Sequence, residues 1–250
     1  MRGAGEPQHH RTVDRVTEIL EQVVYNPGLT FAQLARALNA PKSSVYGFIR
    51  GLLAKGWLYE EDRGFYLGPA VHGLTLASGH IRAGMVSHAD VAALHEATGT
   101  AVFLGVPAGE YLIYIAEAGA DAISGIEAQR NIRRTLLGTA GGKALLAARP
   151  DRELEAFLRS HSAEGREVLE SFLGEYQDIR RTGIATNIRL NGTRFAIATT
   201  VRDKSGKAVA SVTLLGPTEM VKPQMKALSE TLRKHVNAWS ERSVRAREAI

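Results

Sequence analysis

The sequence predicts a mixed α+β fold in two domains, and two observations carry this prediction. Between residues 12 and 56, apolar residues recur at the spacing of amphipathic helices. From residue 100 onward, short apolar strands are separated by Gly-containing turns and alternate with longer helical segments. The second part of the chain therefore has the order strand, strand, helices, strand, strand, strand, helix. This order predicts a largely antiparallel sheet covered by helices.

The composition is that of a globular protein and excludes some kinds of site. The chain has 250 residues, of which 44% are hydrophobic and 23% charged, and a formal net charge of +5. A mildly basic chain is compatible with nucleic acid but does not require it. With no cysteine, neither a disulfide nor a thiolate metal site can form. Residues 1–11 are polar and aperiodic, which predicts a mobile arm. No apolar run is long enough to span a membrane, so we expect a cytoplasmic protein.

The first expected helix begins at Thr12, whose hydroxyl can cap it, and ends at the Asn-Pro-Gly of residues 26–28. Its apolar stripe consists of Val13, Val16, Ile19, Leu20, Val23 and Val24. A second, short helix is expected after Thr30, which can cap it in the same way. Its buried face consists of Leu34, Ala35 and Leu38.

A third helix is expected over residues 42–55, because Pro41 suits the start of a helix and Gly56 its C-terminal cap. Its stripe consists of Val45, Phe48, Ile49, Leu52 and Leu53. Aromatic-rich strands at residues 57–59 and 65–67 follow, on either side of an acidic turn. Helix, turn, helix and aromatic hairpin together predict a winged helix-turn-helix domain at residues 12–68.

The charges of this stretch are segregated. Residues 31–57 contain four basic side chains and no Asp or Glu. A helix that enters the major groove of DNA needs cations beside it and no carboxylate facing the phosphates. An ordinary helical hairpin with a solvated basic face is the alternative, but the added hairpin favours DNA binding.

A linker helix is expected at residues 69–84, and a second domain at residues 85–250. In this domain the sequence predicts strands at residues 100–106 and 111–116, followed by a long loop at residues 119–134. Helices are expected at residues 139–149, 150–158, 168–182 and 222–247. The strands at residues 184–190 and 193–201 should form a hairpin, because Asn191-Gly192 favours a tight turn. A last strand is expected at residues 208–215.

Residues 137–144, with the sequence LGTAGGKA, invite comparison with a phosphate-binding loop. That loop requires Gly where Leu137 stands and a hydroxyl where Ala144 stands, which excludes this mechanism. A helix start built of small residues remains. Its free N–H groups can hold a carboxylate, or its small side chains can simply allow close packing on a sheet. The spacing alone leaves both open.

No pattern supports catalysis, a metal site or a cofactor. The chain has no Gly-x-Ser-x-Gly motif. The histidines that follow the N-terminal arm are spread out and have no carboxylate partner at ligand spacing. They are His72, His80, His88, His95, His161 and His235.

Three motifs in this order resemble the IclR family of bacterial transcriptional regulators. They are LARALNAPKSSVYGFIRGLLAKGWL with GFYLG, then TAGGKALLA, and finally VRDKSGKAVASVTLLGP. The resemblance extends from about residue 12 to residue 240. It implies a winged helix-turn-helix, a linker helix and a GAF-like effector-binding domain. It also implies a homodimer, often paired into a tetramer, that binds a palindromic operator and responds to a small organic acid.

The resemblance implies the DNA-binding residues Thr30, Lys42, Ser43, Ser44, Tyr46, Gly47, Arg50 and Arg63. Family members commonly carry Arg where Gly47 stands. Gly cannot make the bidentate contact that Arg makes with guanine, so another residue must recognise the bases. Arg50, one helical turn further on, can make this contact instead. Arg63, in the wing, can enter the minor groove or contact phosphate.

The resemblance also implies an effector pocket lined by Leu137, Thr139, Ala140, Gly141, Asn187, Phe195, Thr213 and Leu215. Thr139, Ala140 and Gly141 would form its anion-binding end. The family often has acidic residues near Asn187 and a smaller residue where Phe195 stands. A bulky Phe195 and a missing carboxylate indicate a different ligand shape or a partly filled pocket.

Two functions are therefore compared. The first is a transcriptional regulator, expected to be a repressor, whose operator affinity changes when a small organic acid binds. The second is a metabolite-binding enzyme or sensor whose N-terminal helices mediate protein contacts. The acid-free basic stretch favours the regulator, and the missing catalytic constellation disfavours the enzyme.

Overall fold

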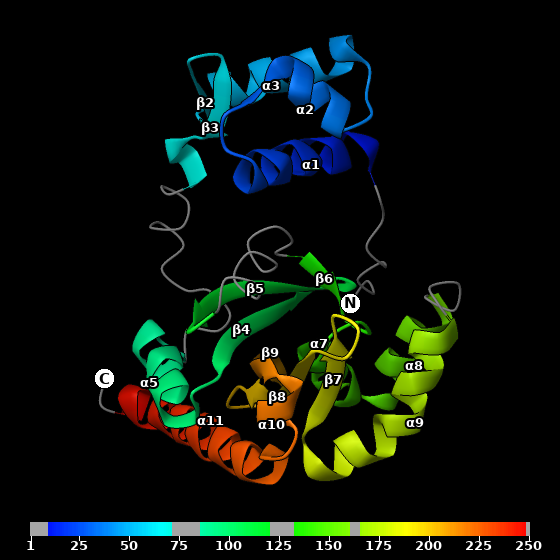
Figure 1. The fold of residues 1–250 in the computed structure, drawn as a ribbon, viewed down its shortest axis with the longest axis vertical. Helices are drawn as coiled ribbons and strands as arrows, with labels where there is room; N and C mark the ends of the chain where they lie inside the picture. Colours follow the sequence, from blue (N-terminus) through cyan, green and yellow to red (C-terminus); the bar gives the residue numbers. More distant parts are fainter. Residues whose placement is uncertain (1–9, 72–85, 121–132, 161–165, 249–250) are drawn as a thin grey trace. The chain divides into compact units, whose positions relative to one another are not determined.

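A computed structural model of the chain describes residues 10–71, 86–120, 133–160 and 166–248 (Figure 1). The chain divides into two compact units, Met1–Ile81 and Arg82–Ile250. The first holds helices and a small sheet, and the second a six-stranded sheet with helices, as the mixed α+β prediction required. Most of the expected linker helix and of the N-terminal arm lies outside the described residues.

The first unit contains α1 (Arg11–Tyr25), α2 (Phe31–Ala37) and α3 (Lys42–Ala54). Most residues of their apolar stripes meet in one core, as their periodicity predicts, but Val13 and Val24 of α1 are exposed. Its most buried members are Ile19, Val23, Leu34, Val45, Ile49 and Leu58. Arg15 joins α1 to the end of α2, because its Nη1 donates to the Leu38 carbonyl oxygen at 3.0 Å. A carbonyl that the ending helix leaves without a partner is thereby satisfied.

The wing has three strands, β1 (Leu29–Thr30), β2 (Leu58–Glu61) and β3 (Gly64–Leu67), in the order β1-β3-β2. The sequence predicted neither β1 nor the short turn. The turn consists of Asp62 and Arg63, both at positive φ. Gly64 belongs to β3 and not to the turn. A Cβ at Gly64 would lie 2.8 Å from the Gly28 carbonyl oxygen, so only glycine lets β1 approach this closely.

The second unit is built on six strands in the order β6-β5-β4-β9-β8-β7. Every neighbouring pair is antiparallel, which confirms the predicted sheet type. The strands are β4 (Ala101–Ala108), β5 (Tyr111–Ala118), β6 (Arg133–Thr135), β7 (Ala185–Arg189), β8 (Arg194–Arg202) and β9 (Ala208–Pro217). The turn from β7 to β8 covers residues 190–193 and is longer than the two-residue turn expected. Leu190, Asn191 and Gly192 all have positive φ in it.

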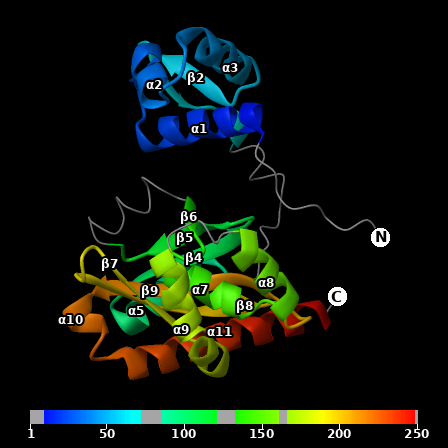
Figure 2. The ribbon, with the colours of Figure 1, turned by 90° about the vertical axis from the view of Figure 1, so that its right-hand side faces the viewer.

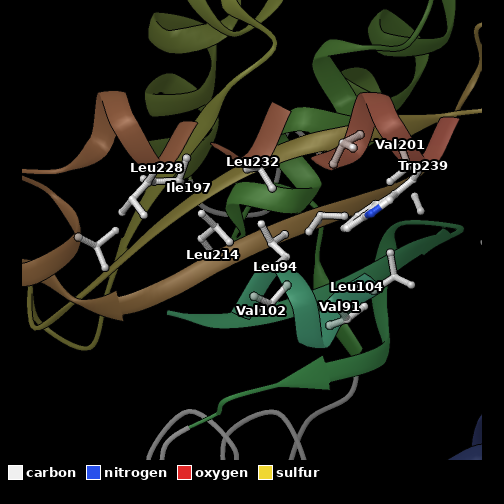
Figure 3. Close-up of a cluster of buried hydrophobic side chains, with 14 of the residues drawn as sticks. Val91, Leu94, Val102, Leu104, Ile197, Val201, Leu214, Leu228, Leu232 and Trp239 are labelled. Carbon is white, nitrogen blue, oxygen red and sulfur yellow. The ribbon is translucent and has the colours of Figure 1, made fainter. Parts of the chain in front are cut away.

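Helices cover both faces of this sheet (Figure 2). One face packs against α5 (His88–Thr98), α10 (Thr218–Val221) and α11 (Met225–Glu248). Figure 3 shows side chains of α5 and α11, among them Leu94 and Trp239, meeting those of the strands. The other face packs against α7 (Ala140–Ala147), α8 (Asp151–Ser160) and α9 (Arg166–Thr182). All residues of α7 are buried.

Candidate functional site

The exposed face of α3 carries the side chains that the sequence assigned to DNA. Lys42, Tyr46 and Arg50 are four residues apart and form one exposed row. Ser43, Ser44 and Gly47 are also exposed, while Val45 and Ile49 face the core. The helix thus separates an apolar inner face from a polar outer face. The structure brings together all the α3 residues of the predicted set.

Glycines leave the surface beside this row open. A Cβ added at Gly47 or at Gly51 would meet no atom within 4 Å. These two positions, one helical turn apart, follow Ser43 along the helix. A backbone without side chains lets a flat or grooved surface approach closely. The surface of α3 is therefore open at Gly47 and Gly51.

The electrostatics of this face favour an anionic partner. Neither Lys42 nor Arg50 has an acidic partner among the residues that the structure describes. Residues 31–57 also contain no Asp or Glu. Exposed cations without partners are available to phosphates, whose counterions they would displace.

The two remaining residues of the predicted DNA-binding set lie outside α3. Arg63 is exposed in the tight turn between β2 and β3. Thr30 is half-buried at the start of α2, where its hydroxyl donates to Gln33 Oε1 at 2.7 Å and its N–H at 2.8 Å. The hydrogen bonds of Thr30 thus hold the first turn of α2.

In the second unit, the start of α7 faces the middle of the sheet. Thr139 caps the helix, because its hydroxyl oxygen accepts the Gly142 N–H at 3.0 Å. Ala140 and Gly141 follow in the first turn, both buried. A Cβ at Gly141 would lie 2.5 Å from Ser211 Oγ and 3.0 Å from Thr213 Oγ1 on β9. The small residues therefore do allow α7 to pack closely on the sheet.

The Ser211 and Thr213 hydroxyls have an unusual environment. Both oxygens are buried, and neither has a hydrogen-bond partner in the described part of the chain. A buried hydroxyl without a partner costs about 1–3 kcal/mol. Sequence reasoning missed Ser211, although it lies two residues before Thr213 and so faces the same side of the strand. Two unpaired donors beside a helix start are suited to an acceptor-rich ligand.

Other members of the predicted pocket lie around this point. Asn187, on β7, donates from Nδ2 to the Gly138 carbonyl oxygen at 2.9 Å and so holds the loop before α7. Leu137 is buried in the apolar cluster beneath α7. Leu215 packs against Ala140 together with Ala196 and Ala198 of β8.

The structure corrects the prediction for Phe195. This side chain lies in the core that contains α10 and α11, on the face of the sheet opposite α7. Side chains alternate along a strand, so Ala196 and Ala198 face α7 while Phe195 does not. On β8, the side chains opposite the start of α7 are therefore alanines, and the bulk attributed to Phe195 is absent there.

A further polar contact, also missed from the sequence, anchors α7. Lys143 Nζ donates to both carboxylate oxygens of Glu175 at 3.1 Å and to the Thr186 carbonyl oxygen at 3.3 Å. The Lys143 side chain is only 5% exposed, against 38% for Glu175. The lysine of the motif that resembles a phosphate loop is thus engaged in a structural clamp between α7, α9 and β7.

Two kinds of site are not found in the described ranges. No group of three or more metal-ligating side chains occurs there. No helix described is long and apolar enough to cross a membrane.

The chain matches two family models. The IclR helix-turn-helix domain matches residues 12–62, and the model described as bacterial transcriptional regulator IclR C-terminal matches residues 75–241. The HTH-type transcriptional regulator BhcR of Paracoccus denitrificans is 28% identical to this chain in an alignment that covers 92% of this chain and 86% of BhcR.

Solved structures share the fold at low sequence identity. The Thermotoga maritima IclR has a TM-score of 0.63 and 22% identity, with 94% of this chain and 99% of that chain covered. An IclR homologue from Microbacterium hydrocarbonoxydans, in complex with 4-hydroxybenzoate, has a TM-score of 0.71 and 16% identity, with 92% and 97% covered.

Proposed function

The chain belongs to the IclR family of bacterial transcriptional regulators, and on this premise we propose that it is a repressor whose operator affinity is controlled by a small organic acid. It is a DNA-binding regulator with an effector-binding C-terminal domain, and not an enzyme. The repressor role and the organic acid are the proposed parts. We place the DNA-binding domain at residues 12–68, the linker helix at residues 69–84 and the effector domain at residues 85–250, in a cytoplasmic protein.

The exposed row on α3 carries the DNA part of the proposal. Lys42 and Arg50 project from a helix that has no acidic residue, and open glycine positions lie beside them. We assign base contacts to Ser43, Ser44 and Arg50, with Tyr46 beside Arg50 on the same DNA-facing surface, and phosphate contacts to Lys42 and Arg63. Thr30 supports this surface by holding the start of α2. A homodimer, alone or paired into a tetramer, would present two such surfaces to a palindromic operator.

The unpaired Ser211 and Thr213 hydroxyls support a carboxylate effector. Together with the N–H groups at the start of α7, they offer several donors to one anion. The small side chains of Ala196 and Ala198, opposite the start of α7, would contact the apolar part of the ligand. A protein of the same fold has been crystallised with 4-hydroxybenzoate, which is an aromatic carboxylate.

A binding assay tests the whole proposal. Double-stranded DNA that the protein enriches from a random library would be used in a gel shift, with and without a panel of aliphatic and aromatic carboxylates. We expect one palindromic sequence to be enriched, and at least one carboxylate to change its affinity. If no DNA is enriched at low salt, the chain does not act through DNA. If DNA binds but no carboxylate alters the binding, the effector class is wrong.

Arg50→Ala is expected to weaken binding to the enriched DNA by about 5–150-fold, because a bidentate contact with guanine is worth roughly 1–3 kcal/mol. Binding to a scrambled duplex should change little.

Arg63→Ala is the comparison. Because Arg63 is assigned to a phosphate, its removal should weaken binding to both duplexes equally and lower the salt dependence by about one counterion. Equal effects on both duplexes for Arg50→Ala would make Arg50 a phosphate-binding residue as well.

Thr213→Val is expected to stabilise the unliganded second unit by about 1 kcal/mol, because it removes a buried hydroxyl that has no partner. The same change should abolish the thermal stabilisation by the effector. Thr199→Val is the matched control on β8. The Thr199 hydroxyl donates to the Gly183 carbonyl oxygen at 2.8 Å, so its removal should lower stability but leave the effector response unchanged. A destabilised Thr213→Val that still responds would remove Thr213 from the site.

A further inference from the structure

The Arg50 side chain lies over an aromatic ring of its own helix. Its Cζ is 5.9 Å from the centre of the Tyr46 ring, which is one helical turn closer to the N-terminus. A guanidinium above an aromatic face is attracted by the ring electrons. Arg50 forms no hydrogen bond or ion pair with any other residue that the structure describes. The donors at the edge of the guanidinium are therefore free for another partner.

The Tyr46 ring is itself held in place. Phe31, the first residue of α2, contacts it in an edge-to-face arrangement, with ring centres 5.9 Å apart and planes at 86°. Phe31 is half-buried and packs against the core of the first unit. Tyr46 is 54% exposed, so Phe31 is the contact that restricts its ring from the protein side. The Tyr46 ring thus lies between Phe31 of α2 and the exposed side chain of Arg50.

Arg50 has no stronger interaction to orient it. Within the described part of the chain it has no acidic partner, and Gly47 and Gly51 provide no side chain beside it. An exposed arginine that is otherwise unrestrained loses considerable side-chain entropy when it binds. A stack that already restricts it lowers this cost, because planar preorganised groups lose less freedom per hydrogen bond.

We propose that Phe31, Tyr46 and Arg50 form one reading unit, in which the two rings position the Arg50 guanidinium for a bidentate contact with guanine. The inference rests on the proposed DNA-contacting role of α3 and extends it in two ways. It assigns Phe31, which is half-buried and does not belong to the exposed row, as a positioning residue. It also predicts a G·C pair at a defined place in each half-site, since guanine offers two acceptors in the major groove.

The alternative is that the stack only stabilises the helix. Side-chain pairs four residues apart support a helix whether or not DNA is present. Such a role would change the thermal stability of the first unit but not the preference for one DNA sequence over another. Sequence preference is therefore the measurement that distinguishes the two roles.

The test is a double-mutant cycle on the full chain, with fluorescence anisotropy on two duplexes. One duplex is the sequence that the wild type enriches from a random library, and the other is a scrambled duplex of equal composition. The variants are Tyr46→Leu, Arg50→Met and their combination. Tyr46→Phe, which keeps the ring, is the conservative control. Phe31→Leu tests the edge-to-face contact that Phe31 makes with Tyr46. Trp57 fluorescence during heating, measured in a Trp239→Phe background, reports whether the first unit remains folded.

On the enriched duplex, Tyr46→Leu should weaken binding about two- to fivefold, the effect of one exposed cation–π contact. Tyr46→Phe should bind as the wild type does, and Phe31→Leu should weaken binding about twofold. In the Arg50→Met background, Tyr46→Leu should have no further effect. Replacing the predicted G·C pair should remove the effect of Arg50→Met. The scrambled duplex should bind all folded variants equally.

Additive effects of Tyr46→Leu and Arg50→Met would overturn the reading unit, because Tyr46 would then contact DNA independently. Equal effects on both duplexes, or unchanged binding with Tyr46→Leu, would overturn it as well. These results differ from a failure of the proposed function, in which the wild type itself enriches no duplex.

Discussion

Gly142→Ala is expected to destabilise the second unit by about 3 kcal/mol or more, because a Cβ has no room there. It would overlap the Leu136 carbonyl oxygen and lie 2.5 Å from the Leu136 Cα. These are backbone atoms of a residue that is fully buried, so no side chain can turn away. Relief requires α7 to move off the segment before it, which breaks packing in a close-packed core. Ala would otherwise be favoured over Gly in a helix.

Gly174→Ala is the matched control. Gly174 is an exposed residue of α9, and a Cβ there would meet no atom within 4 Å. This variant should gain about 0.5–1 kcal/mol from helix propensity. Urea unfolding can be followed by the fluorescence of the buried Trp239 in a Trp57→Phe background. If Gly142→Ala unfolds at the wild-type urea concentration, the close approach of α7 to Leu136 is not a constraint.

The helices of this chain could be predicted from the sequence because their signals are local. The stripes of α1 and α3 and the glycine after α3 mark these elements within a few residues of where they occur. The strand β1 could not be predicted in this way. It has only two residues. It pairs with β3, where Gly64 lets the backbone of Gly28, just before β1, approach closely. That pairing joins positions far apart in the sequence.

The proposed effector site was predictable only in part, for the same reason. Thr139 and Gly141 lie in one motif, and the structure places them at the start of α7 as expected. Phe195 was assigned to the wrong face of the sheet, because a shift of one residue along a strand reverses every side chain. Ser211 shares its face with Thr213, which alternation along β9 could have indicated. Its missing hydrogen-bond partner is visible only once the sheet and α7 are packed.

The Lys143–Glu175 clamp could not be found from the sequence at all, since its partners lie 32 positions apart. Its position relates it to the proposed effector site. Lys143 donates to Thr186 of β7, and the next residue, Asn187, donates to the loop before α7. The clamp and the Asn187 contact therefore hold the helix start from the same edge strand. Breaking the clamp should affect the effector site as well as the stability of the unit.

Glu175→Ala is expected to cost about 2–3 kcal/mol, more than Lys143→Met, for which we expect about 1 kcal/mol. The asymmetry follows from burial. The Lys143 side chain is 5% exposed in the intact pair, and without Glu175 its ammonium keeps only the Thr186 carbonyl as partner. A buried charge without its partner is strongly unfavourable. Without the lysine, the Glu175 carboxylate is 38% exposed and can be hydrated, and Ser171 still donates to it at 3.1 Å.

An exposed pair on the same helix provides the control for this prediction. Asp178 and Arg181 of α9 are 2.9 Å apart, with side chains 76% and 73% exposed. Asp178→Ala should cost no more than about 0.5 kcal/mol, because solvent screens such pairs. Urea unfolding of the three variants should give the order Glu175→Ala, Lys143→Met, Asp178→Ala from the largest destabilisation to the smallest. The reverse order for the first two would mean that water reaches Lys143 once Glu175 is removed.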